Sequence, residues 1–269
     1  DISGVVNNGS LSITLYNHNH TYTDGFNLIG NPYPSPIDWD SEEGWSRSEI
    51  NDAIYFFRAG TSNQYTGTYS SYVNGISSDG NASSIIPSMQ GFFVKVSAGS
   101  YPVTGTILID NRARVNSLSP LYMKSGSKGP AALIRLGARS GDNTLTSDVL
   151  AVYLDAKATE EFDEELDALK ILNTDLQVLN LWTVEPGQKR LSINALPDLL
   201  DKDYTIPVGI KTSTNGNVTF CLTHEEGMLA REGIFLTDSL TGTVTQLGGG
   251  RSYSVDLNAG DYPGRFFLN

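Results

Sequence analysis

The feature that most constrains the fold is a proline-punctuated turn in the segment GFNLIGNPYPSPIDW, residues 25–39. Three of the five residues 32–36 are proline. Each proline fixes φ and removes a backbone donor, so residues 31–36 are excluded from a helix or a central strand. Apolar residues lie on both sides of the turn. We therefore expect a strand that runs into a turn of fixed shape, with Tyr33 and Trp39 holding this turn against a first sandwich.

Short strand patterns dominate the rest of the chain. Residues 11–16 (LSITLY) alternate apolar and polar side chains, which is typical of a half-buried strand. Gly, Ser, Asn and Tyr are abundant between residues 60 and 84, which indicates long loops or a hairpin. Further strands are predicted in the first half at 53–57, 91–96 and 106–110, and in the second half at 131–136, 149–154, 178–184, 191–195, 204–210, 217–223, 234–237, 243–247, 252–257 and 265–268.

The spacing of these strands predicts an all-β protein with two antiparallel β-sandwiches of jelly-roll or Ig-like type. The first spans residues 1–115 and the second residues 131–269. Residues 116–130 (NSLSPLYMKSGSKGP) have the composition of a linker. One short helix is predicted near 160–171, because Phe162, Leu166 and Leu169 share the spacing of one helix face and Thr159 can cap it.

Charge and cysteine content exclude several classes of protein. The formal net charge is −12, so the surface repels phosphate, and neither nucleic acid nor an anionic membrane is an expected partner. No apolar run reaches 18 residues, so no membrane insertion is expected. The lone cysteine, Cys221, cannot form an intrachain disulfide. We expect a buried, inert thiol; the alternative is a catalytic thiol with His224 as its base.

Two groups of residues could bind a metal ion. His18 and His20 would share a strand face and, with Asp24, could begin a metal site, although the sequence also fits a polar hairpin tip. An acidic run could bind a structural calcium ion, but it lacks the glycine turn of calcium loops and also fits the solvated face of the predicted helix. The run comprises Glu160, Glu161, Asp163, Glu164, Glu165 and Asp167. We therefore expect no cofactor.

One pair of carboxylates supports an enzymatic alternative. Asp38 and Asp40 flank Trp39 and would share a strand face, and paired carboxylates can hydrolyse glycosidic bonds. No Gly-x-Ser-x-Gly nucleophile motif, dinucleotide fingerprint or phosphate loop occurs. Residues 248–250 (GGG) lie between two predicted strands and indicate a turn.

Aromatic residues in the first half are the candidate binding residues. Tyrosine in polar loops offers stacking surface and a hydroxyl, which suits a sugar or a protein partner. The alternative is that these side chains pack under long loops. The candidates are Trp39, Trp45, Tyr65, Tyr69 and Tyr72.

The ordered motifs resemble modules of secreted and cell-surface proteins of the Bacteroidetes that use the type IX (Por) secretion route. The resemblance rests on residues 25–39, on AIY at 53–55 and on IPSMQGFFV at 86–94. The second half resembles the β-sandwich that precedes the sorting domain of such proteins, through FD at 162–163, DALK at 167–170 and YPGRFFL at 262–268. A further C-terminal sorting domain would be expected beyond Asn269.

This resemblance implies a non-catalytic, adhesin-like or scaffold module, located outside the cell or on its outer surface. Such a module could bind an extracellular glycan or a host or matrix protein through the aromatic loops of the first half. The alternative is a glycan-active enzyme, or a carbohydrate-binding accessory domain of one. A calcium-stabilised structural segment is a third possibility. The family resemblance assigns no catalytic residues.

Overall fold

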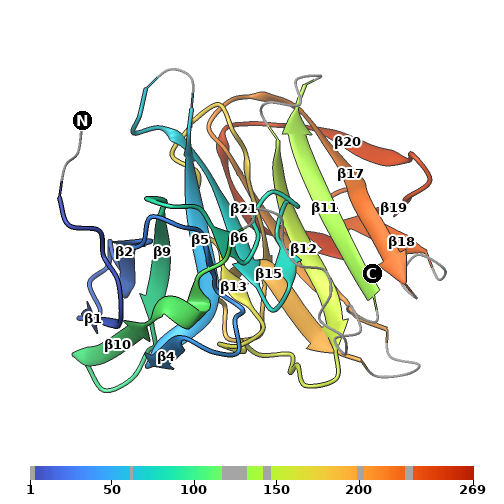
Figure 1. The fold of residues 1–269 in the computed structure, drawn as a ribbon. Helices are drawn as coiled ribbons and strands as arrows, with labels where there is room; N and C mark the ends of the chain where they lie inside the picture. Colours follow the sequence, from blue (N-terminus) through green and yellow to red (C-terminus); the bar gives the residue numbers. More distant parts are fainter. Residues whose placement is uncertain (1–3, 61–62, 117–131, 142–146, 199–202, 228–232) are drawn as a thin grey trace.

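A computed structural model describes residues 4–60, 63–116, 132–141, 147–198, 203–227 and 233–269 (Figure 1). Strands account for the regular structure of these residues, apart from one 3-10 turn at Asn111–Ala113. The all-β prediction is therefore confirmed. Among the described residues, no helix is long and apolar enough to cross a membrane.

The first part, up to residue 116, contains two antiparallel sheets and one additional strand pair. One sheet has the order β1-β10-β4, the second has the order β2-β9-β5-β6-β7, and β3 pairs with β8. Residues predicted as loops or a hairpin at 60–84 contain the strands β6 and β7. The strands are β1 (Leu11–Asn17), β2 (Phe26–Gly30), β3 (Ile37–Asp38), β4 (Trp45–Ser48), β5 (Ile50–Ala59), β6 (Gly67–Val73), β7 (Ile76–Ser77), β8 (Ile85–Ile86), β9 (Gly91–Val96) and β10 (Val103–Ile109).

The second part, from residue 132, forms one large sheet with the order β19-β18-β21-β16-β14-β15-β12-β11-β17-β20. Its end strands β19 and β20 contact each other, so the sheet nearly closes into a barrel. The strands are β11 (Ala132–Ser140), β12 (Asp148–Asp155), β13 (Ala168–Leu169), β14 (Asn180–Val184), β15 (Arg190–Pro197), β16 (Ile206–Thr212), β17 (Gly216–Gly227), β18 (Ile234–Asp238), β19 (Thr243–Leu247), β20 (Ser252–Leu257) and β21 (Gly260–Leu268).

One strand pair departs from the antiparallel prediction. β12 and β15 run parallel, with Ala151 level with Ile193. A parallel pair needs a long crossover between its strands. Residues 156–189 supply it, and they include β13 and β14.

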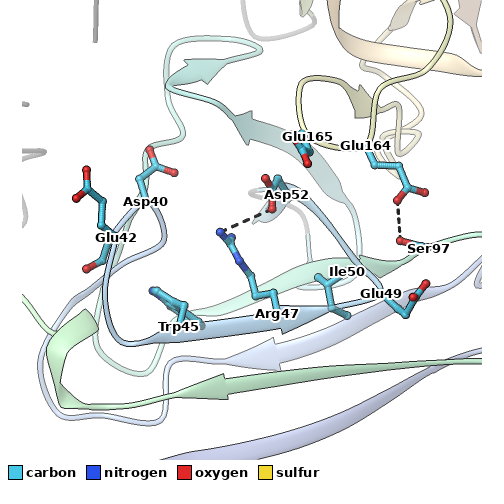
Figure 2. Close-up of a pocket in the computed structure, with 11 residues that line it drawn as sticks. Asp40, Glu42, Trp45, Arg47, Glu49, Ile50, Asp52, Ser97, Glu164 and Glu165 are labelled. Atoms are coloured by element: carbon cyan, nitrogen blue, oxygen red, sulfur yellow. Dashed lines mark hydrogen bonds and ion pairs between the residues drawn. The ribbon is translucent and has the colours of Figure 1, made fainter. Parts of the chain in front are cut away.

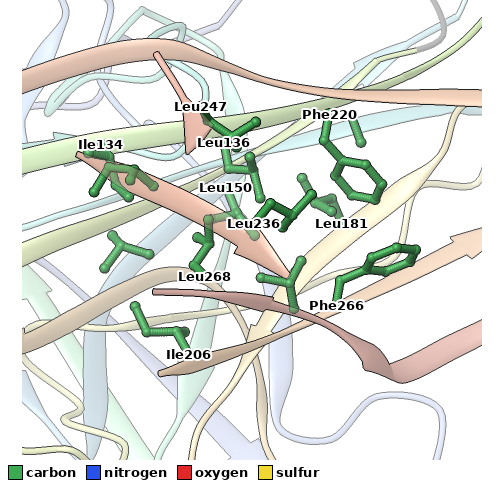
Figure 3. Close-up of a cluster of buried hydrophobic side chains, with 14 of the residues drawn as sticks. Ile134, Leu136, Leu150, Leu181, Ile206, Phe220, Leu236, Leu247, Phe266 and Leu268 are labelled. Carbon is green, nitrogen blue, oxygen red and sulfur yellow. The ribbon is translucent and has the colours of Figure 1, made fainter. Parts of the chain in front are cut away.

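The inner faces of the strands form separate cores in the two parts. In the second part, Leu136, Leu181, Phe220 and Phe266 belong to one buried cluster (Figure 3). In the first part, a second cluster lies between the sheets and includes Trp39. Burial of apolar area contributes about 25 cal/mol per Å², so these clusters provide the main driving force for folding.

A third cluster joins the two parts. Tyr55 and Val73 from the first part pack with Tyr153 and Ile193 from the second. Among the described residues, strands pair only with strands of the same part, whereas the third cluster contains residues of both parts. The division into domains 1–115 and 131–269 therefore remains a prediction, namely that these two parts fold independently. The predicted linker, apart from Asn116, lies outside the described residues.

The helix predicted near 160–171 is wrong. This segment forms turns and the short strand β13. Carboxylates in the segment bond to backbone N–H groups, which competes with helical hydrogen bonding. The Asp163 carboxylate accepts a bond from the Thr159 N–H at 2.6 Å, and the buried Asp167 carboxylate accepts one from the Asp163 N–H at 2.7 Å. Leu166, one of the three apolar residues at helical spacing, instead reaches the shared core.

The proline-rich turn has the shape and position predicted from the sequence. Residues 31–36 are in neither helix nor strand. Asn31 connects the turn to the segment before β9: its side-chain amide donates to the Ile86 and Pro87 carbonyls at 3.1 and 3.0 Å. Tyr33 and Trp39 are each 1% exposed within the first core. Their expected anchoring role is confirmed.

Candidate functional site

An acidic cleft of about 690 Å³ lies where the first part meets the crossover of the second (Figure 2). We use the term acidic cleft for the space lined by Asp40, Ser41, Glu42, Trp45, Arg47, Glu49, Ile50, Asp52, Ser97, Glu164 and Glu165.

The strand β4 and the start of β5 supply the floor of the cleft. The indole N–H of Trp45 donates to the Asp38 carbonyl at 2.8 Å, which fixes the ring. The Arg47 guanidinium stacks over the Trp39 ring at 4.3 Å and forms an ion pair with Asp52 at 3.7 Å. Figure 2 shows Arg47 extending from β4 toward Asp52. Among the described residues that line the cleft, Arg47 is the one cation; it pairs with its own wall through one nitrogen, while its Nη1 is buried without a hydrogen-bond partner.

The second part closes the other side of the cleft. The Asp52 N–H donates to the Glu164 carbonyl at 3.0 Å. The Ser97 hydroxyl donates to the Glu164 carboxylate at 2.8 Å (Figure 2). These bonds hold the acidic run at residues 160–167 against the first part, so the cleft depends on both parts.

The charge of the cleft is strongly negative. Six of its lining residues are acidic and one is basic. Burial raises the pKa of Asp52, and the nearby Arg47 partly offsets this rise. Such a field attracts cationic groups. However, among the described residues, no group of three or more histidine, cysteine or acidic side chains is arranged to hold a metal ion.

The carboxylates proposed for the enzymatic alternative do not share the cleft. Asp40 lines it, but Asp38 does not. The Asp38 carboxylate accepts a bond from the Asp40 N–H at 3.1 Å, which is a local turn contact. The Asp40 carboxylate accepts a hydrogen bond from the buried Tyr72 hydroxyl. The arrangement stabilises a turn and does not present two carboxyl groups to one substrate.

The five candidate aromatic residues are not brought together. Trp39 and Tyr72 are buried, at 1% and 7% exposed, so neither can bind a partner as predicted. Trp45 is half-buried at the cleft, with its ring edge-on to Trp39 at 4.9 Å. Tyr69 is half-buried on β6 and packs between Phe57 and Phe93. Tyr65 is 77% exposed. Most of these rings therefore support the sheets, which was the alternative interpretation.

The remaining candidates occupy ordinary structural positions. His18 and His20 are exposed, with ring centroids 5.7 Å apart. Cys221 is half-buried on β17, whereas a buried thiol was expected; its strand leaves the core at this point. His224 is exposed and lies 3.4 Å from the Glu226 carboxylate.

Sequence reasoning missed the main components of the cleft. Arg47, Asp52 and Glu164 carry no motif, and Glu164 belongs to a segment predicted as a separate helix. The acidic run at 160–167 was the available signal, but only the tertiary structure places it beside β5.

Comparison with known proteins gives a family. Residues 1–269 match the model of a family described as "Domain of unknown function (DUF8693)", and the chain belongs to this family. The chain is also similar to the minor fimbrium subunit Mfa5 of Porphyromonas gingivalis, with 26% identity over 264 residues. The match covers 91% of this chain but 21% of that protein, so the chain spans about a fifth of the relative. No solved structure matches significantly.

Proposed function

We propose that this DUF8693 chain is a non-catalytic structural module of a larger bacterial surface protein, located outside the cell or on its outer surface. The carrying observation is the similarity to a fimbrium subunit along nearly the whole chain. A module of this kind positions other segments of its protein and transmits force between them. Secretion by the type IX route belongs to the same proposal and rests on the sequence resemblance.

The structure supports a mechanical role in two ways. The two parts share a buried cluster, and the segment at 163–175 bonds to the first part at several points. For example, the Tyr69 N–H donates to the Asn173 side chain at 3.0 Å, and the Gly67 N–H to Thr174 at 2.9 Å. Such non-local contacts resist separation of the two parts.

The geometry gives no support to the glycoside-hydrolase alternative at Asp38 and Asp40. Inverting and retaining enzymes require two carboxyl groups on either side of one bond. Here one carboxylate bonds to a turn N–H and the other to Tyr72.

Two variants of the full-length protein test the proposal in the bacterium that encodes it. An in-frame deletion of residues 1–269 should reduce the amount of the protein displayed on intact cells, measured by antibody labelling. The double variant D38N/D40N keeps hydrogen-bond acceptors at both positions but removes both carboxylates, so display and surface assembly should remain at wild-type level.

Normal display and assembly after the deletion would contradict a structural role. A loss of function in D38N/D40N, with normal folding and display, would instead favour the enzymatic alternative.

A further inference from the structure

Asn194 places a polar side chain in an otherwise apolar interior. It lies in the middle of β15 and is 4% exposed. In the sheet, Asn194 is level with Val152, and Leu196 is level with Leu154. These three neighbours belong to the core of the second part. Because alternate residues of a strand share a face, the carboxamide of Asn194 points to the same interior as Leu196.

No hydrogen bond from a described residue reaches this carboxamide, yet its nitrogen and oxygen are not fully enclosed, because they open into the space beside the strand. Buried polar groups nearly always have partners, because an unbonded buried amide loses its interactions with water and gains nothing in return. The buried Asn173 follows the rule: its side chain donates to the Leu179 carbonyl at 2.9 Å and accepts from the Tyr69 N–H. Asn194 differs from it, because its amide opens into the adjoining space and is available to a molecule there.

The side chain of Asn194 lines a cavity of about 230 Å³, which we name the β15–β16 slot. The slot forms because β14, which lies between β15 and β16, ends at Val184. The first residues of β16, Ile206 and Pro207, extend past this end and leave a gap beside β15. The slot has room for about seven water molecules or one small organic molecule. Its lining residues are Glu160, Val184, Glu185, Pro186, Gln188, Asn194, Leu196, Tyr204, Thr205, Ile206 and Pro207.

The lining combines apolar walls with hydrogen-bonding groups of both kinds. The Tyr204 ring and two prolines offer flat apolar surface, while the amides of Asn194 and Gln188 can donate and accept. The buried Glu185 carboxylate is held in place by the Lys189 N–H at 2.7 Å and offers acceptor oxygens. A sugar ring has the matching chemistry, because its hydroxyls donate and accept while its C–H face packs on aromatic surface.

Other classes of ligand fit less well. An anion would be repelled by the carboxylates in the wall and by a net charge of −12. An extended peptide that added a strand would need backbone donors, and Pro207 has none on the facing strand.

We propose that the β15–β16 slot binds one neutral monosaccharide unit of a glycan, with the Asn194 carboxamide hydrogen-bonded to its hydroxyls. This site goes beyond the structural role proposed above and uses none of the aromatic residues first considered for binding. Its failure would leave the structural role intact.

Saturation-transfer difference NMR with the intact chain tests the proposal. The probes are glucose, galactose, mannose, fucose and N-acetylglucosamine, each at millimolar concentration. At least one sugar should receive saturation from the wild-type protein. The variant N194L replaces the amide with an apolar side chain of similar size and should weaken binding of that sugar by about tenfold or more.

Thr183→Val is the matched control. The Thr183 hydroxyl is fully enclosed and has no partner among the described residues, and it does not line the slot. T183V should therefore bind the sugar like the wild type. Equal binding by N194L, or equal loss in both variants, would overturn the assignment.

A second measurement does not depend on the folding of any variant. In a ¹⁵N-labelled wild-type chain, the side-chain NH₂ resonances of Asn194 should shift when the bound sugar is added. If no sugar in the panel shifts them, the slot holds water only and the proposal is wrong.

Discussion

The junction between the two parts can be weakened by removing one oxygen atom. Tyr55, on β5 of the first part, is 1% exposed, and its hydroxyl oxygen accepts a hydrogen bond from the Leu169 N–H of the second part at 2.9 Å. Burial also raises the pKa of Tyr55 well above its usual range, so the hydroxyl is neutral at physiological pH. The variant Y55F keeps the ring in the shared core but leaves the buried Leu169 N–H without its acceptor.

The expected loss of stability follows from that unpaired donor. Leaving one buried backbone N–H unsatisfied costs about 1–3 kcal/mol. A chain of 269 residues that unfolds as one unit has an unfolding entropy of about 0.6 kcal/mol/K. Y55F should therefore lower Tm by about 2–5 °C.

Thermal unfolding followed by tryptophan fluorescence measures this shift, because Trp39 and Trp182 lie in the cores of different parts. Tyr65 is 77% exposed, so the control Y65F should change stability by no more than about 0.5 kcal/mol. If Y55F unfolds at the same temperature as Y65F, the bond across the junction contributes nothing and the reasoning fails.

Three further changes test other parts of the structure, each by urea unfolding. W39A removes a ring from the first core and its hydrogen bond to the Asp52 carbonyl at 2.8 Å. It should lower the free energy of unfolding by about 3–5 kcal/mol. A loss below about 1 kcal/mol would show that the ring does not anchor the turn. Hydrogen bonds from Arg265 lower the pKa of Asp238 to about 2, so the wild type should lose stability as the pH falls below about 4, and D238N should lack this loss. Burial raises the pKa of Asp167 to about 7, so protonation favours the folded state and the wild type should gain stability as the pH falls through 7. D167N should flatten that gain, and an unchanged pH profile would show that Asp167 is not its source.

Local sequence patterns predicted the strands and the turn well. Period-two alternation located β1, and the three prolines excluded residues 31–36 from regular structure. Such features depend on residues close in sequence, so the sequence alone determines them.

Features that depend on distant residues were not predictable. The segment at 160–171 has a helical spacing of apolar residues, but its carboxylates bond to backbone N–H groups and Leu166 packs in a core shared with the first part. The burial of Trp39 and Tyr72 could not be predicted from the sequence either. Their sequence neighbours are polar or glycine, but in the fold both side chains are buried. The parallel pairing of β12 with β15 likewise has no local signal.

Whether the two parts form one cooperative structural unit is the central question for the proposed mechanical role. Differential scanning calorimetry of the wild-type chain answers it most directly, by comparing the calorimetric enthalpy with the van't Hoff enthalpy. The shared core of Tyr55, Val73, Tyr153 and Ile193 predicts one transition with equal enthalpies. Two separate transitions, or a calorimetric enthalpy about twice the van't Hoff value, would show that the parts unfold independently and would contradict the account.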